Sequence, residues 1–189
     1  MCAMLRWLTP DYRVAKVEAL SLDLLRQWGI DSLLLDADCT LKRYRAREVT
    51  PEVAAWLDAM RAAGIGLCLL SNGYGGRIGE FAGRLGLPFV AKAMKPLPVG
   101  CRAALRTMAF SPARTALVGD QVFADVLAGR MAGLKTILVE PIHPEEEPWY
   151  TRLKRPPERW VLRRQAPPLP EGEGRCPLDI WLAGRSNNS

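Results

Sequence analysis

The sequence predicts an α/β fold, with a doubly wound and mostly parallel sheet that carries helices on both faces. Short apolar runs are typical of buried strands, and they alternate along the chain with helices of about ten residues, which indicates βαβ units. Polar side chains follow several of these runs, at the strand ends where an open α/β sheet binds its ligand. The runs span residues 32–35, 65–70, 89–91, 115–118 and 136–139.

The first central strand, residues 32–35, delivers two carboxylates and a hydroxyl at its end: Asp36, Asp38 and Thr40. On a continuing strand Asp36 and Asp38 would share one face, where their charges repel unless a cation or a shared proton lies between them. Hard oxygen ligands suit Mg²⁺, so the segment indicates metal-assisted chemistry with a carboxylate nucleophile. For this segment alone, a plain turn after a strand remains the alternative.

A helix is predicted to begin after Thr50, which is a favourable N-cap, and to end at Gly64. Pro51 stands at the first helical position, where its missing N–H breaks no hydrogen bond. Its apolar face follows the spacing i, i+3, i+4, i+7 and consists of Val53, Trp56, Leu57 and Met60.

Further helices are predicted at residues 78–85, 101–108 and 122–132, each with an apolar stripe. A short helix over 22–28 precedes the first strand. A helix over 149–164 is also predicted, but two consecutive prolines interrupt it.

The length of 189 residues fits one domain and a tail. We expect residues 1–30 to form an N-terminal extension that packs on the core, and residues 31–164 to form the domain. Residues 165–189 are dominated by Pro, Gly, Glu, Asn and Ser, a composition that predicts a disordered tail.

The composition suits a globular protein that binds anions. Hydrophobic residues make up 49% of the chain, enough for a core, and the formal net charge of +6 favours phosphorylated substrates, anionic lipid surfaces or nucleic acid. The five cysteines are scattered, which argues against a disulfide framework or a zinc site and favours a reducing compartment. Without an apolar run of about 18 residues or the layout of a secretory signal, the expected location is the cytoplasm.

Later strand ends carry the polar groups that phosphoryl transfer needs, since that chemistry depends on positioning and charge neutralisation. Ser71 and Asn72 follow the second strand, a lysine follows the third, and Asp120 and Asp125 follow the fourth. In a parallel sheet these ends converge on one crevice. Each group alone also fits a turn, a helix cap or a solvated loop.

Together these residues resemble the haloacid dehalogenase (HAD) superfamily of phosphatases over residues 32–140. The resemblance rests on Asp36-Ala37-Asp38-Cys39-Thr40, on Ser71, on Lys95-Pro96 and on Gly119-Asp120 with Asp125. It implies a HAD-like Rossmannoid sheet. Lys95 is favoured over Lys92 because it precedes Pro96, as in the family pattern. Cys39 departs from the subgroup, which usually has Asn there.

The resemblance also implies a role for each matching residue. Asp36 would be the nucleophile that forms an aspartyl-phosphate, and Asp38 would be the general acid and then the general base. The catalytic set is Asp36, Asp38, Ser71 and Lys95, and the groups expected to bind substrate phosphate are Thr40, Ser71, Asn72 and Lys95. The implied Mg²⁺ ligands are Asp36, the backbone carbonyl of Asp38, Asp120 and Asp125. The only histidine, His143, is given no catalytic role.

Substrate size follows from the spacing of the motifs. HAD enzymes for small metabolites usually insert a cap domain after the first or the second motif. The intervals from Thr40 to Ser71 and from Ser71 to Lys95 leave no room for one. The resemblance therefore implies an open site that acts on large or surface-bound substrates.

A narrower resemblance, to the HAD-IIIA group related to phosphatidylglycerophosphate phosphatase, extends over residues 5–164. It rests on flanking motifs such as residues 8–12, 137–141 and 147–152. It implies a lipid phosphomonoester substrate in phospholipid synthesis and peripheral contact with an anionic membrane at the inner face. The basic and aromatic segment 149–164 suits such a surface, although it would equally suit a solvated helix that packs its aromatic residues on the domain.

Two other functions stay open at this point. One is a HAD phosphatase for a soluble nucleotide, sugar phosphate or phosphoprotein. The other is a non-catalytic protein that binds RNA or a ribosome-assembly partner, but the complete catalytic set argues against it, and no obligate nucleic-acid partner is expected.

Overall fold

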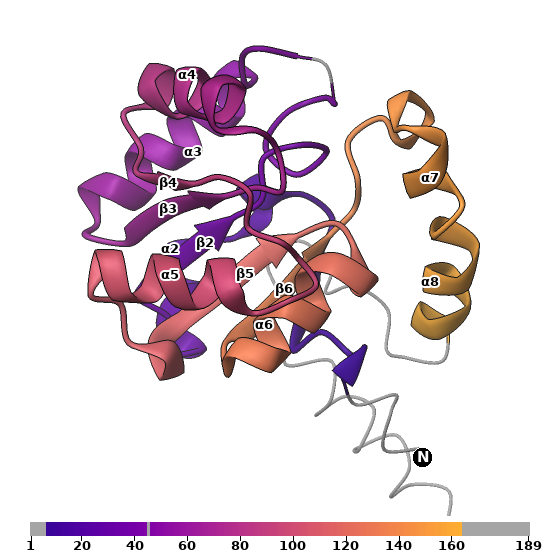
Figure 1. Cartoon of the computed structure of the whole chain (residues 1–189). Coiled ribbons are helices and arrows are strands. Elements are labelled where there is room, and N and C mark those ends of the chain that lie inside the picture. The colour runs from indigo at the N-terminus through magenta and orange to yellow at the C-terminus, as the bar shows by residue number, and fades with distance from the viewer. Residues whose placement is uncertain (1–6, 45, 164–189) are drawn as a thin grey trace, which may run out of the picture.

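The computed structural model describes residues 7–44 and 46–163 and places six strands in one parallel sheet (Figure 1). The spatial order is β1-β6-β5-β2-β3-β4. The strands are β1 Tyr12–Val14, β2 Ser32–Leu35, β3 Gly66–Leu70, β4 Phe89–Val90, β5 Thr115–Gly119 and β6 Lys135–Val139. The prediction of a doubly wound parallel sheet is confirmed.

Strand β2 lies at the centre of the sheet because all four of its residues are apolar or small enough to be buried on both faces. Leu35 pairs with Leu69 of β3 on one side and with Val118 of β5 on the other. This register brings the carboxyl ends of the three central strands to one edge of the sheet.

Helices cover both faces of the sheet, as Figure 1 shows. Leu33 and Leu35 point to one face, against α2 (Leu22–Gln27), α3 (Pro51–Ala62) and α4 (Gly75–Leu85). Leu34 points to the other face, against α5 (Val99–Met108) and α6 (Leu127–Ala132). Successive side chains of a strand alternate in this way, so one run of leucines serves two cores.

Local sequence signals mark the ends of two helices. The Thr50 side chain accepts a hydrogen bond from the backbone N–H of Val53 and caps α3, with Pro51 at its first position. Gly86 ends α4 in the left-handed conformation, at φ 61°.

Three features depart from the sequence prediction. Strand β1 adds an edge to the sheet by pairing with β6, although residues 1–20 show no clear periodicity. The predicted helix 122–132 begins as a π-helical turn, Val122–Val126, before α6. The predicted helix 149–164 is divided into α7 (Trp149–Arg152) and α8 (Arg155–Leu162), whose first turn contains the prolines.

The connections between the central strands are short. The segment from β2 to β3 contains α3, and the segment from β3 to β4 contains α4. As predicted, the described residues include no cap domain over this edge. None of the helices in the described part of the chain is long and apolar enough to cross a membrane. The tail predicted at 165–189 lies outside the described residues.

Candidate active site

The site forms where the carboxyl ends of β2, β3 and β5 meet. Asp36 follows β2, Ser71 follows β3 and Asp120 follows β5, while Lys95 comes from the loop between β4 and α5. Asp125 reaches the same place from the π-helical turn after β5. The structure thus brings together residues that lie up to 89 positions apart in the sequence.

Lys95 is the centre of a buried charge cluster. Its Nζ donates hydrogen bonds to Asp36 Oδ1 at 2.5 Å, to Asp125 Oδ1 at 2.6 Å and to the Leu70 carbonyl at 3.1 Å. Burial lowers the pKa of Lys95, but the carboxylates of Asp125 and Asp36 outweigh this and raise it above its ordinary value. The ammonium group is therefore held charged between two carboxyl groups. Lys92, the other candidate, is exposed and lies over the Tyr74 ring at 5.8 Å.

The Asp36 carboxyl is in a setting that disfavours its charge. Burial raises its pKa to about 8; Lys95 acts against this rise, and the nearby Asp125 and Asp120 add to it. A divalent cation beside these groups would reverse the balance, because opposite charge favours the ionised carboxylate.

Asp120 is held from two sides. Its Oδ1 accepts a hydrogen bond from Thr40 Oγ1 at 3.1 Å, and its Oδ2 accepts one from the Arg155 guanidinium. Burial raises the pKa of Asp120 to about 7, while Arg155 opposes the rise and Asp125 adds to it. Thr40 therefore orients Asp120 in this structure.

Three carboxylates are placed to share one cation. One oxygen each from Asp36, Asp120 and Asp125 lie within 4.8 Å of one another, and all three residues are buried. Three buried carboxylates this close together form a donor set that fits a hard divalent ion. Gly119 makes the approach possible, since a Cβ there would lie 2.2 Å from Asp125 Cγ.

Asp38 faces the same cavity but has different partners. Its Oδ1 accepts a hydrogen bond from Lys42 Nζ, and its Oδ2 accepts one from Arg77 at 3.0 Å. The neighbouring Cys39 has φ 64°, in the left-handed region that Asn tolerates better than other non-glycine residues. An Asn would suit this conformation, and this chain adopts it with a Cys.

Ser71 and Asn72 have well-defined contacts at the end of β3. Ser71 is buried, and its Oγ accepts a hydrogen bond from the Gly73 amide at 3.1 Å. The Asn72 side chain binds the backbone of Lys95 twice, accepting from its N–H at 2.7 Å and donating to its carbonyl at 2.9 Å. Asn72 therefore fixes the loop that carries Lys95.

An open cavity of about 550 Å³ connects these groups to the surface. The buried Asp36, Ser71 and Lys95 form its inner wall, and the more exposed Asp38 and Asn72 line it as well. The wall also contains aromatic and basic side chains: Tyr44, Tyr74, Phe123, Tyr150, Arg77 and Lys154. A larger cavity of about 840 Å³ beneath α7 and α8 is lined by Asp120 and Arg155, but by none of the residues of the inner wall.

Arg155 is the principal residue that the sequence analysis missed. It binds the side chain of Asp120, the Asp120 carbonyl at 2.7 Å, both carboxylate oxygens of Glu147, and Glu158 at 3.3 Å. Glu158 in turn accepts a hydrogen bond from the Phe123 amide at 3.0 Å. The sequence did contain one signal for this contact. Arg155 and Glu158 are three positions apart, so they share one face of a helix, and two prolines lie between them.

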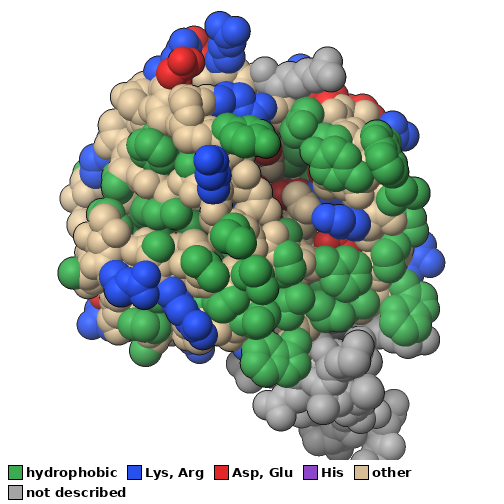
Figure 2. Space-filling model, in the orientation of Figure 1, with side chains coloured by type: hydrophobic (Ala, Val, Ile, Leu, Met, Phe, Trp, Pro, Cys, Tyr) green, Lys and Arg blue, Asp and Glu red, His purple; other side chains and the backbone are tan. Residues whose placement is uncertain are grey.

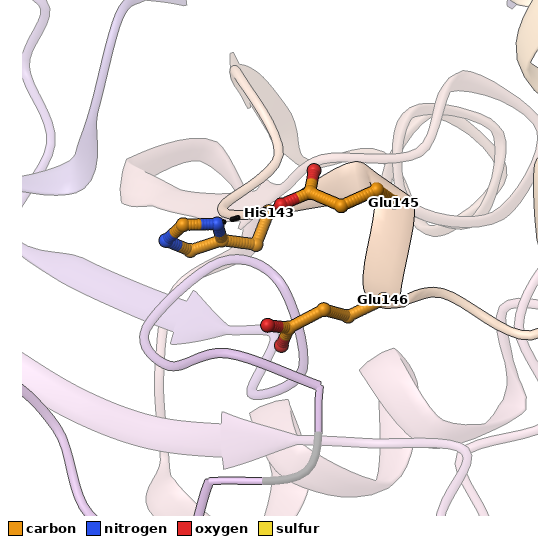
Figure 3. Close-up of side chains that lie close together, drawn as sticks. All are labelled: His143, Glu145 and Glu146. Carbon is orange, nitrogen blue, oxygen red and sulfur yellow. Dashed lines mark hydrogen bonds and ion pairs between the residues drawn. The ribbon is translucent and has the colours of Figure 1, made fainter.

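A second group of possible metal ligands lies away from this cavity. His143, Glu145 and Glu146 lie close together on the segment after β6 (Figure 3). His143 Nδ1 is 2.8 Å from Glu145 Oε1, and Glu146 forms an ion pair with Arg43. His143 and Glu145 are exposed, and each side chain already has a protein partner, so the group is explained as surface ion pairing.

Comparison with known proteins agrees with this geometry. The profile of the haloacid dehalogenase-like hydrolases matches residues 7–133. The chain is 31% identical over 157 residues to the Probable phosphatase YqeG of Bacillus subtilis, covering 83% of this chain and 91% of that protein.

Solved structures show the same fold. The cobalt-bound form of the deoxy-D-mannose-octulosonate 8-phosphate phosphatase YrbI from Haemophilus influenzae is similar with a TM-score of 0.50 and 15% identity, over 74% of this chain and 90% of that one. A hypothetical protein from Xanthomonas campestris gives a TM-score of 0.50 and 17% identity, over 74% and 78% of the two chains. The family profile and the Bacillus subtilis relative each match most of this chain, and the geometry of the site agrees with both. The chain is therefore a phosphatase of the haloacid dehalogenase-like hydrolase family.

Proposed function

We propose that this phosphatase hydrolyses a lipid phosphomonoester, phosphatidylglycerophosphate, through an aspartyl-phosphate on Asp36, and that it belongs to the HAD-IIIA group. The observation that carries the chemistry is the position of Asp36. It lies on the inner wall of an open cavity, 2.5 Å from Lys95 Nζ, with two more buried carboxylates within 4.8 Å.

The reaction has two steps. Asp36 attacks the phosphorus, and the bond between phosphorus and the ester oxygen breaks while Asp38 gives its proton to the leaving oxygen. Water then attacks the same phosphorus, Asp38 takes a proton from it, and Asp36 is released with inorganic phosphate. Lys95 and Ser71 bind the phosphoryl oxygens, since both lie on the inner wall beside Asp36.

The proposed cofactor is Mg²⁺, held by Asp36, Asp120, Asp125 and the backbone carbonyl of Asp38. When bound, it neutralises the charge of the phosphoryl group. Thr40 and Asn72 were expected to contact phosphate. Their hydrogen bonds favour a supporting role, in which Thr40 orients Asp120 and Asn72 fixes Lys95.

The surface around the cavity supports a lipid substrate. Figure 2 shows hydrophobic side chains gathered around a hollow on this face, and some of them lie in the region of α7 and α8. Tyr74 and Tyr150 line the cavity and are 80% and 53% exposed, and Trp149 and Leu153, which line the larger cavity, are 72% and 66% exposed. Such residues suit the boundary between headgroups and acyl chains, where basic neighbours add electrostatic attraction. We therefore propose peripheral, salt-sensitive binding to the inner face of an anionic membrane.

The chemistry is tested first with a generic phosphomonoester. Phosphate release should require Mg²⁺ and should be lost in Asp36→Asn, because an amide is a poor nucleophile and a weaker ligand. Asp38→Asn should lose a factor of about 10²–10⁴. Asp58→Asn is the matched control, since Asp58 is an exposed aspartate on α3 that pairs only with Arg61 in the described contacts. Full activity in Asp36→Asn would contradict the mechanism.

The substrate is tested by comparing phosphatidylglycerophosphate in vesicles with soluble sugar phosphates and nucleotides. We expect higher kcat/KM for the lipid, and co-sedimentation with anionic vesicles at low salt that is lost at high salt. A soluble phosphomonoester is the second candidate, favoured by Arg77 and Lys154 in the cavity wall, which suit an anionic leaving group. Faster turnover of a soluble ester, without vesicle binding, would establish that candidate.

A further inference from the structure

Asp38 is bound by two cations of very different exposure. Lys42 contacts its Oδ1 with a side chain that is 4% exposed, and Arg77 contacts its Oδ2 with a side chain that is 56% exposed. Arg77 and Asp38 line the active-site cavity, whereas Lys42 does not. Lys42 instead lines a second cavity of about 290 Å³ next to α4, whose wall also includes Arg77. Oδ1 of Asp38 is therefore fixed by a residue outside the active-site cavity, and Oδ2 is contacted by a residue of the cavity wall.

Lys42 is held in place independently of substrate. The loop after β2 folds back so that the Cys39 N–H donates to the Lys42 carbonyl at 2.8 Å, and the Lys42 N–H donates to the Ala37 carbonyl at 3.3 Å. The ammonium lies 5.3 Å from the centre of the Phe81 ring, a cation–π contact with a buried residue of α4. Burying an ammonium is costly unless it is paired, and Asp38 is the carboxylate that pairs with it.

We propose that Lys42 is the positioning residue of the acid–base group: it fixes Asp38 Oδ1 so that Oδ2 points at the leaving-group oxygen. Arg77 is exposed, and the proposal requires it to release Oδ2 when the leaving group enters. Lys42 contacts neither substrate nor phosphorus, so it acts only through Asp38. This inference rests on the proposed function, in which Asp38 protonates the leaving oxygen.

The test uses the dependence of the rate on the leaving group. An alkoxide must be protonated as it departs, whereas p-nitrophenolate is stable as an anion near neutral pH. For each variant, kcat/KM is measured with glycerol 1-phosphate and with p-nitrophenyl phosphate, because kcat/KM reports the first irreversible step. A misplaced group costs up to about 10²-fold in rate. We expect Lys42→Met to lower kcat/KM at least tenfold more for the alkyl ester than for the aryl ester.

The control is Lys92→Met. Lys92 also lies over an aromatic ring, that of Tyr74, but is exposed and does not line the cavity, so both esters should keep their rates. Asp38→Asn should show the same bias as Lys42→Met, only larger. If Lys42→Met does not fold by circular dichroism, Lys42→Gln, which keeps a donor without the charge, takes its place.

The outcomes distinguish the role of Lys42 from the acid role of Asp38. Equal losses for both esters in the folded Lys42 variant, with a clear bias in Asp38→Asn, would overturn the role of Lys42 alone. No bias in Asp38→Asn would overturn the acid role of Asp38, and with it both the proposed mechanism and this inference. A bias in both variants, absent from Lys92→Met, is the result that supports the proposal.

Discussion

Replacing Lys95 by Met removes the cation that two buried carboxylates share. Asp36 and Asp125 are 6% and 2% exposed, and both contact Lys95 Nζ within 2.6 Å. Breaking a buried ion pair by removing one partner costs about 3–5 kcal/mol, which is a large part of the roughly 5–15 kcal/mol that stabilises a domain. Methionine keeps most of the side-chain volume, so the loss reflects charge rather than a cavity.

The cost should depend on pH in a defined direction. Because burial raises the pKa of Asp36 to about 8, its carboxyl in the wild-type protein ionises only near and above that pH. Above pH 8, Asp36 of the wild type ionises beside Lys95, whereas in Lys95→Met its folded pKa is higher still and the folded state keeps the proton. The cost therefore grows with pH above 8, by up to about 1.4 kcal/mol per pH unit.

The assay is urea unfolding in EDTA at pH 6 and pH 9, repeated with Mg²⁺. The divalent ion supplies positive charge to the same carboxylates, so it should reduce the difference between Lys95→Met and wild type. Lys92→Met serves as control, and at an exposed position it should cost less than about 0.5 kcal/mol. A cost for Lys95→Met under about 1 kcal/mol at pH 9, or one that falls as pH rises, would refute the reasoning.

Three further changes are predicted. Gly119→Ala places a Cβ 2.2 Å from Asp125 Cγ and should lower kcat/KM by about 10²-fold. Gly83→Ala on α4 is the control: it has open space around it and should be neutral or slightly stabilising in thermal unfolding. Cys39→Asn should raise the free energy of unfolding by up to about 1 kcal/mol in urea titration, because φ at residue 39 is 64°. The affinity for Mg²⁺ in calorimetry should rise between pH 6 and pH 8 and then level off, since Asp36, with a pKa of about 8, must lose its proton to bind; a flat profile would contradict this.

The order of the central elements followed from the sequence because the relevant signals are local. The buried run of β2, the cap at Thr50 and the glycine that ends α4 each depend on a few neighbouring residues. In a parallel sheet the crossover rules then fix which strand ends meet. The convergence of Asp36 and Asp120 is a consequence of those rules, and the structure brings them within reach of one ion.

Other features depend on contacts between distant segments, which local patterns do not encode. Strand β1 has three residues, and its pairing with β6 depends on the completed sheet. The π-helical turn at Val122–Val126 contains the five-residue hydrogen bond of a π-helix, from the Val126 N–H to the Gln121 carbonyl at 3.3 Å. Hydrophobic periodicity cannot separate that turn from an α-helix. Lys42 begins the polar and basic stretch 42–49, where no local pattern indicates burial, and it is buried by its contact with Phe81 of α4.

The C-terminal helices connect the proposed surface to the proposed metal site. Arg155 and Glu158 on α8 point inward, where Arg155 is 11% exposed and binds Asp120, so this basic residue is not available to a membrane. In this segment the basic residues open to an anionic surface include the exposed Arg152, Lys154 and Arg159, at about 1 kcal/mol each. Inward and outward side chains alternate on the same short helices. A bilayer that shifted α8 would therefore also shift the guanidinium that holds Asp120, and membrane contact would change metal binding through one residue.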